Sequence, residues 1–95
     1  MSRYANRSRD IVYMLFVKSL PCYVGIDCSG EIEADHAGDH GIGRKGDDCK
    51  TIPLCKKHHA ERHAHAGYFR DFDKIQMREW KANAIAKTQS RWGKQ

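Results

Sequence analysis

Long apolar segments are absent from this chain. The longest hydrophobic run, Ile11 to Val17, is far shorter than the ~20 apolar residues that a membrane-spanning helix needs. The first four residues, Met1 to Tyr4, are polar and basic, which does not fit a secretory signal peptide. We therefore expect a cytoplasmic protein that has no membrane partner.

The chain is also short and holds few cysteines. Its 95 residues predict one small domain over 1–95, and a domain of this size buries only about 60–65% of its unfolded surface. Small domains are often completed by disulfides or by a structural metal. The four cysteines could serve either purpose, but cytoplasmic thiols stay reduced. Metal ligation is therefore the favoured interpretation of the cysteines.

Acidic residues are outnumbered by basic ones. Seventeen Lys and Arg stand against twelve Asp and Glu, which gives a net charge of +5. Such a field attracts polyanions, so DNA is the expected partner and RNA stays open. A solvated surface rich in lysine is the alternative. The candidate nucleic-acid contacts are the basic residues around the ligand cluster described below: Arg44, Lys45, Lys56, Lys57 and Arg62.

The pattern along the chain predicts an α+β fold. Residues 10–19 favour a helix that Pro21 would end, with Ile11, Leu15 and either Met14 or Lys18 on one face, although their β-branched and aromatic content would also suit a strand. Two short strands are expected over 31–35 and 51–54, separated by a glycine-rich loop over 38–46. Residues 55–66 suit a second helix that Gly67 would end. A basic arm over 1–9 would precede these elements, and a helical extension capped by Asp73 would occupy 69–95.

Three cysteines and one histidine have the spacing of a zinc site. Cys55 and His58 form a C-x-x-H pair, and Cys22 and Cys28 form a wider C-x5-C pair. A Cys3His set is a normal tetrahedral zinc shell. Cys49 is left over and could replace one of the ligands or pack as a small apolar residue. Two unrelated core cysteines and a surface histidine are the structural alternative.

A second group of residues has the composition of a catalytic site. Asp35 and His36 end a predicted strand, and His59 lies on the following predicted helix. A carboxylate and a neutral imidazole can hold one divalent cation. His36 would then be free to act as a base. Phosphodiester hydrolysis needs a base that deprotonates water and a cation at the phosphate.

These residues carry a resemblance to a known family. Asp35-His36, the loop Gly41-Ile42-Gly43, and the string from Pro53 to His63, Pro-Leu-Cys-x-x-His-His-x-x-x-His, resemble HNH endonucleases. The resemblance is closest to the small phage-type branch that includes RecA-dependent recombination nucleases, and it covers about 20–70. It implies a zinc-stabilised ββα-metal (His-Me finger) domain with flanking helices, encoded by a phage or prophage.

The resemblance also implies a role for each residue. His36 becomes the general base, and Asp35 and His59 become ligands of a catalytic cation such as Mg²⁺ or Mn²⁺. His63, four residues after His59 on the same helix face, would complete this shell or contact a phosphate. The structural zinc shell consists of Cys22, Cys28, Cys55 and His58.

Two positions depart from the family pattern or stay open. The family usually has an Asn that orients the base histidine, and this stretch has none between Asp47 and Thr51. Asp48 is the expected substitute. His40 lies in the glycine-rich loop and could be a base, a phosphate contact or a residue without function.

The expected activity is metal-dependent cleavage of DNA with little sequence specificity, because phosphate contacts carry no sequence information. A zinc-stabilised nucleic-acid-binding module without catalysis is the main alternative. A zinc module that joins a phage or host recombination or packaging complex is a third interpretation. The sequence does not determine the form of the nucleic acid or the identity of the catalytic cation.

Overall fold

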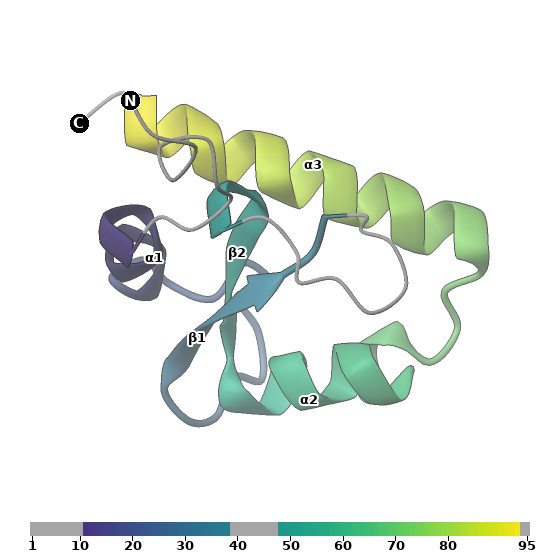
Figure 1. Ribbon diagram of the computed structural model, residues 1–95. Coiled ribbons are helices and arrows are strands. Elements are labelled where there is room, and N and C mark those ends of the chain that lie inside the picture. The colour runs from purple at the N-terminus through teal and green to yellow at the C-terminus, as the bar shows by residue number, and fades with distance from the viewer. Residues whose placement is uncertain (1–10, 39–47, 94–95) are drawn as a thin grey trace.

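The computed structural model describes residues 11–38 and 48–93. The predicted arm over 1–9 lies outside these ranges, as do His40, Arg44 and Lys45. The elements, in chain order, are α1 (Ile11–Lys18), β1 (Ile32–His36), the 3-10 turn η2 (Asp48–Lys50), β2 (Thr51–Cys55), α2 (Lys56–Ala64), the 3-10 turn η3 (Gly67–Phe69) and α3 (Lys74–Gly93) (Figure 1). This is a small α+β fold in which a β-hairpin is followed by a helix, as the sequence predicts.

The two strands form the whole sheet of the described residues. They pair antiparallel, with Asp35 opposite Ile52 and His36 opposite Thr51. Each strand ends one residue later than the sequence pattern predicts. His36 therefore lies within β1 rather than in the loop that follows, and Asp35, inside the strand as predicted, is completely buried.

Pro53 sits inside β2 without weakening the hairpin. Its carbonyl accepts a hydrogen bond from the Tyr23 amide at 2.7 Å, so the backbone polar groups of Pro53 point away from β1. In an antiparallel strand the nitrogen and carbonyl of one residue face the same side. The missing N–H of proline therefore costs no bond to β1, and the free edge of β2 receives the loop that carries Cys22.

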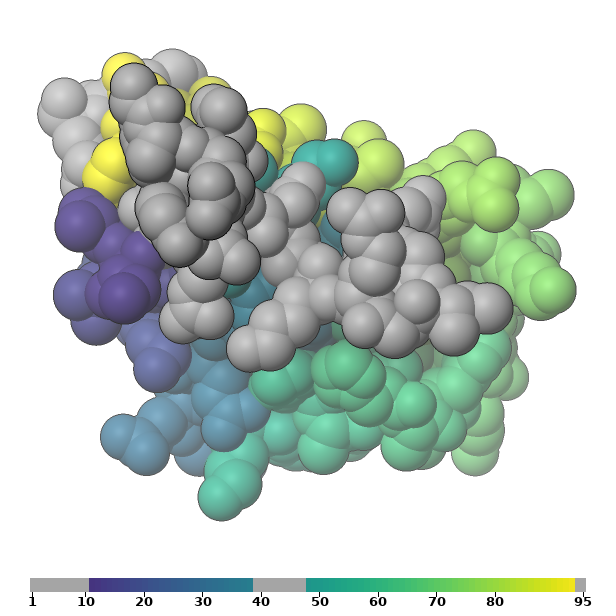
Figure 2. Space-filling view, viewed as in Figure 1, coloured from purple at the N-terminus to yellow at the C-terminus, as the bar shows by residue number. Residues whose placement is uncertain are grey.

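The hairpin lies between two helices. Figure 1 shows α2 and α3 on opposite sides of it, with α1 against its flank. The space-filling view from the same direction shows α1 at the left, α3 along the top and α2 at the bottom (Figure 2). All five residues of β2 are buried. Ile52 and Leu54 meet Ala84 of α3 in the core, and Phe69 packs edge-to-face on Trp80 at 4.9 Å. No helix among the described residues is long and apolar enough to cross a membrane.

The face of α1 that Ile11 and Leu15 share is not the buried one. Ile11 and Leu15 are 63% and 62% exposed, whereas Tyr13 and Val17 are buried. The ring of Tyr13 packs against Trp92 at the end of α3, at a centroid distance of 5.3 Å. The larger aromatic contact therefore decides which face of α1 turns inward, and it comes from a residue that is distant in the sequence.

The predicted end of α2 is wrong by two residues. The helix stops at Ala64, and His65 takes the left-handed conformation with φ 55°. The amide of His65 bonds the carbonyl of Arg62, and its ring bonds the carbonyl of Phe72 at 2.7 Å. Gly67 instead begins the next turn, with φ 53° and no room for a Cβ beside the Glu61 carboxylate.

The long C-terminal helix α3 begins with a reciprocal cap. The Asp73 carboxylate accepts from the Gln76 amide at 2.7 Å, and the Gln76 side chain accepts from the Asp73 amide at 2.9 Å. This is the capping-box arrangement. The buried positions Ala84 and Thr88 follow the predicted core stripe, so the prediction of a helix capped by Asp73 is confirmed.

Asp73→Ala should lower the free energy of unfolding by about 1 kcal/mol, because the Gln76 amide at the start of α3 loses its side-chain acceptor. Asp71→Ala is the matched control, since Asp71 is 92% exposed and makes only a 3.9 Å contact with Arg70. Urea titrations of both variants, followed by circular dichroism, measure the difference. Equal stability of the two variants would contradict the capping role.

Candidate functional site

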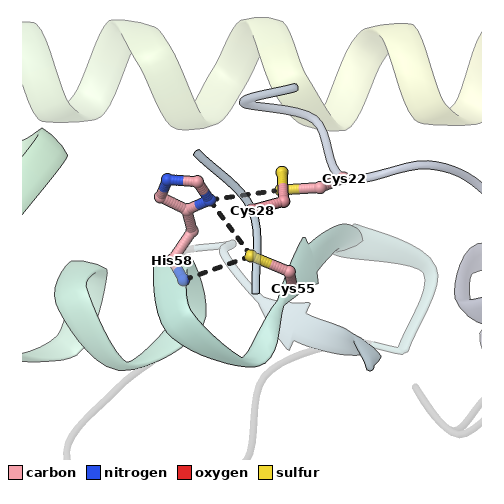
Figure 3. A group of neighbouring side chains, drawn as sticks. All are labelled: Cys22, Cys28, Cys55 and His58. Atoms are coloured by element: carbon pink, nitrogen blue, oxygen red, sulfur yellow. Dashed lines mark hydrogen bonds between the residues drawn. The ribbon is translucent and has the colours of Figure 1, made fainter. Parts of the chain in front are cut away.

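Cys22, Cys28, Cys55 and His58 come together in one cluster. Their ligand atoms all lie within 4.8 Å of one another. The Nδ1 atom of His58 is 3.1 Å from the sulfur of Cys55 and 3.5 Å from that of Cys22. Figure 3 shows Cys55 and His58 at the start of α2, with Cys22 and Cys28 supplied by the loop that precedes β1. The cluster is consistent with a structural zinc site.

Local backbone contacts bring the loop to α2. The amide of Lys56 bonds the Glu31 carbonyl at 2.8 Å, and the amide of Lys57 bonds the Ser29 carbonyl at 3.1 Å. Gly30 permits this approach, because its φ is +89° and a Cβ there would lie 2.7 Å from the Cβ of Lys56. The first amides of α2, which lack partners within the helix, are thus used to fix the loop.

The thiols of the cluster differ in acidity. Loss of water and then the neighbouring thiols of Cys22 and Cys55 raise the pKa of Cys28 to about 11. Burial opposes ionisation of Cys55 too, but the amides of His58 and Ser29 donate to its sulfur, and its pKa is lowered overall. A divalent cation would offset the mutual repulsion of the three thiolates, because a coordinated thiol is deprotonated.

Glu61 is a further residue near this cluster that the sequence pattern does not reveal. Its carboxylate lies 4.0 Å from Nε2 of His58, the ring nitrogen that points away from the sulfurs. This separation is too long for a hydrogen bond, so Glu61 adds negative charge beside the ring without holding its proton. The Tyr68 amide donates to the same carboxylate at 3.2 Å, which holds it in place. Cys49 is exposed and lies outside the cluster.

Asp35, His59 and His63 form a second cluster. Their ligand atoms also lie within 4.8 Å of one another. One oxygen of Asp35 is 3.9 Å from Nε2 of His59 and 3.8 Å from Nε2 of His63. Loss of water, together with the charges of Arg62 and His59, lowers the pKa of His63 although Asp35 opposes this. A neutral imidazole is the form that can bind a metal.

Arg62 forms an ion pair with the carboxylate of Asp35. Its Nε and Nη2 atoms donate to the two oxygens of Asp35 at 2.5 Å each. Such bidentate pairs are strong and geometrically specific. Arg62 was expected to contact nucleic acid, but the structure gives its guanidinium an internal partner. The pair neutralises a fully buried carboxylate, so a cation at Asp35 would share or replace this contact.

Glu33 orients His59, a role that the sequence analysis missed. The Nδ1 atom of His59 donates to the Glu33 carboxylate at 2.5 Å. Because a carboxylate only accepts, Nδ1 carries the proton and Nε2 keeps its lone pair toward Asp35. The signal was present in the alternation of β1, where residues two apart share a face. Glu33 therefore lies on the same side as Asp35.

His36 is held by Asp48. Its Nε2 atom donates to Asp48 at 2.8 Å, and His36 itself is 36% exposed. Nδ1 is then the ring nitrogen that keeps a lone pair. The resemblance predicted Asp48 in place of an Asn that orients the histidine through backbone contacts, and in the structure the side chain of Asp48 contacts His36. The hairpin register places η2 at the end of β1, which brings the two residues together.

The remaining predicted contacts lie at the start of α2. Lys56 and Lys57 are exposed, and the Lys57 ammonium donates to the Asp27 carbonyl at 3.0 Å. Lys57 therefore contributes to holding the loop between Cys22 and Cys28. Lys56 covers Gly30 with its side chain.

Comparison of the chain with protein-family models, curated proteins and solved structures finds no match. The function has to be inferred from the geometry of the two clusters and their surroundings.

Cys55→Ala should unfold the protein and release its zinc, because structural zinc supplies folding free energy directly. Cys49→Ser is the matched control, since Cys49 lies outside the cluster. Metal analysis and circular dichroism of both purified variants provide the measurement. A folded, zinc-free Cys55→Ala protein would show that the cluster has no structural role.

Arg62→Gln should destabilise the fold by about 3–5 kcal/mol, because it leaves the buried charge of Asp35 without a partner. Arg70→Gln is the control, since Arg70 is 76% exposed and such surface changes usually stay within ~0.5 kcal/mol. Adding Asp35→Asn to Arg62→Gln should restore part of the loss. Equal urea midpoints for Arg62→Gln and Arg70→Gln would contradict this account.

Proposed function

We propose that this protein is a metal-dependent endonuclease of the HNH, or ββα-metal, type that hydrolyses phosphodiester bonds of DNA. One observation carries the proposal. Two groups of residues meet at the end of β1, because Asp35 and His36 are neighbours in that strand. Asp35 belongs to the possible cation site with His59 and His63, and His36 is hydrogen-bonded to the Asp48 carboxylate. The order of hairpin and helix, with a zinc cluster at their junction, supports the same family.

His36 serves as the general base in this proposal. Its Nε2–H is engaged by Asp48 at 2.8 Å, so the lone pair of Nδ1 is free to accept a proton from water. The negative charge of Asp48 also stabilises the imidazolium that forms. A positioned base of this kind contributes roughly 10²–10⁴-fold to a rate. The partial exposure of His36 gives water and substrate access to it.

Asp35, His59 and His63 would hold the catalytic cation. Oxygen and imidazole donors at these separations suit a divalent ion such as Mg²⁺ or Mn²⁺. When bound, such an ion supplies charge stabilisation at the scissile phosphate and the leaving oxygen. Glu33 keeps the Nε2 lone pair of His59 directed toward the site. Without the ion, Arg62 neutralises Asp35.

A groove beside His36 supplies positive charge for the phosphate backbone. It measures about 300 Å³ and is bordered by Ala37 and Gly38, which directly follow His36, and by Lys50, Arg78 and Lys81. Within residues 11–38 and 48–93, no acidic residue lines it. Contacts of lysine and arginine with phosphates position a substrate without reading its sequence, so cleavage with little sequence specificity is expected.

A zinc-stabilised nucleic-acid-binding module without catalysis is the second candidate. The bidentate Arg62–Asp35 pair favours it, because both oxygens of the only carboxylate in the second cluster already have a partner. This module would keep the zinc cluster and the basic grooves. It would not need His36, His59 or Glu33.

His36→Asn should reduce plasmid nicking by about 10²–10⁴-fold, because the base is lost. His65→Asn is the matched control: His65 lies outside both clusters, and Asn tolerates its left-handed backbone. The assay follows supercoiled plasmid with magnesium, manganese, nickel or EDTA, and zinc content and circular dichroism check the fold.

Nicking by the His36→Asn variant at the rate of His65→Asn would remove His36 from the mechanism. A folded, zinc-loaded protein that nicks with none of the metals would favour the binding module.

A further inference from the structure

The helix α3 carries much of the positive charge of the described chain. It holds five basic residues, Lys74, Arg78, Lys81, Lys87 and Arg91, and one acidic residue, Glu79. Two grooves lie along opposite flanks of this helix. One flank faces the end of β1 and belongs to the proposed catalytic site. The other flank has no role in the mechanism above.

The groove on this second flank combines aromatic and basic side chains. It measures about 440 Å³, within the roughly 300–1,000 Å³ of small-ligand pockets. Its lining includes the aromatic residues Tyr23, Tyr68 and Trp80 and the basic residues Lys87 and Arg91. Among the residues that the structure describes, none that lines it is acidic. We call it the aromatic groove.

The aromatic side chains of this groove are fixed by the zinc cluster and the core. Tyr23 directly follows the ligand Cys22, and its ring meets Trp80 edge-to-face at 5.4 Å. Tyr68 packs against the ligand His58 at 6.0 Å and still exposes 42% of its surface. Rings held in this way lose little entropy when a flat ligand stacks on them.

The two cations of the groove are directed by helix geometry. Lys87 and Arg91 are four residues apart, so they share one face of α3. Both are exposed, and among residues 11–38 and 48–93 neither forms an ion pair with a carboxylate. They therefore offer their charge to a ligand. Two adjacent cations beside aromatic rings fit a ligand with a flat ring and a phosphate.

We propose that the aromatic groove binds an unpaired nucleotide of single-stranded nucleic acid, with the base against Tyr68 and the flanking phosphates on Lys87 and Arg91. Single strands are bound by aromatic rings on which bases stack and by cations that follow the backbone. In a duplex the bases are stacked inside the helix and cannot enter a recessed groove. Single strands are thus the form of substrate that we propose, and only the choice of a nucleic acid as the ligand rests on the proposed function.

The test measures binding of a fluorescein-labelled oligothymidine, and of a duplex of equal length, to the zinc-loaded full chain by fluorescence anisotropy. No other divalent cation is added, so binding is separated from cleavage. Lys87→Gln/Arg91→Gln should weaken oligothymidine binding at least about tenfold. Arg70→Gln/Lys74→Gln removes the same charge at two exposed residues outside the groove and should weaken oligothymidine binding less than about threefold.

A second pair of variants isolates stacking from charge. Tyr68→Leu should weaken oligothymidine binding about tenfold, because one base loses its platform. Tyr68→Phe keeps the ring and should bind within about twofold of the unchanged protein. Zinc content and circular dichroism show whether each variant is folded. If Tyr68→Leu is not folded, Tyr68→Phe and the two double charge variants provide the test of the groove.

Several results would overturn the proposal. One is an equal loss of oligothymidine affinity in the two double charge variants, and another is tighter binding of the duplex than of oligothymidine. A third is displacement of oligothymidine by polyglutamate, or by inorganic phosphate at the same concentration as the oligothymidine. Metal-dependent nicking without oligothymidine binding would remove the groove and leave the proposed nuclease intact. Oligothymidine binding that depends on the groove, without nicking under any metal, would support the groove and contradict the proposed nuclease.

Discussion

The meeting of three sulfurs and one imidazole nitrogen is the constraint on which the rest of this structure depends. The cluster joins the loop after α1, the end of the hairpin and the first turn of α2 within 4.8 Å. The buried core around Ile52 and Leu54 is small, as expected of a chain of this length. A metal at the cluster would supply stabilisation that a chain of this length cannot obtain from apolar burial. The polar backbone of the loop is satisfied because its amides and carbonyls form hydrogen bonds with α2 and β2.

The position of the second cluster follows from the first. Once His58 is fixed, helix geometry sets the directions of His59, Arg62 and His63, since they lie on the same short rigid helix. The hairpin register then sets Asp35 opposite this helix. A buried carboxylate requires a compensating charge. Arg62 supplies it here, and the two histidines offer a place where a cation could supply it instead.

The proposed activities use the two sides of the hairpin differently. The histidines and carboxylates lie between β1, η2 and α2, whereas the aromatic groove lies along α3 beside the zinc cluster. The groove that contains Lys50 and Arg78 lies next to His36 and also borders α3. In our proposal α3 therefore binds substrate on both of its flanks, while α2 and the hairpin supply the cleavage chemistry. The zinc cluster would hold the rings of the aromatic groove and the catalytic helix at the same time.

The sequence by itself determined the features that depend on near neighbours. The C-x-x-H pair, the two strands, the cap at Asp73 and the core stripe of α3 all follow from spacings of a few residues, which the backbone geometry converts directly into positions. Asp48 was named only through a family resemblance, as a substitute for an Asn, and its side-chain contact with His36 became visible only in the structure. Tertiary structure alone decided that Arg62 binds Asp35, that Glu33 orients His59 and that Tyr13 rather than Ile11 faces the core. These contacts join residues far apart in the chain, and they exist only because the hairpin register and the packing of α2 and α3 bring particular side chains within bonding distance.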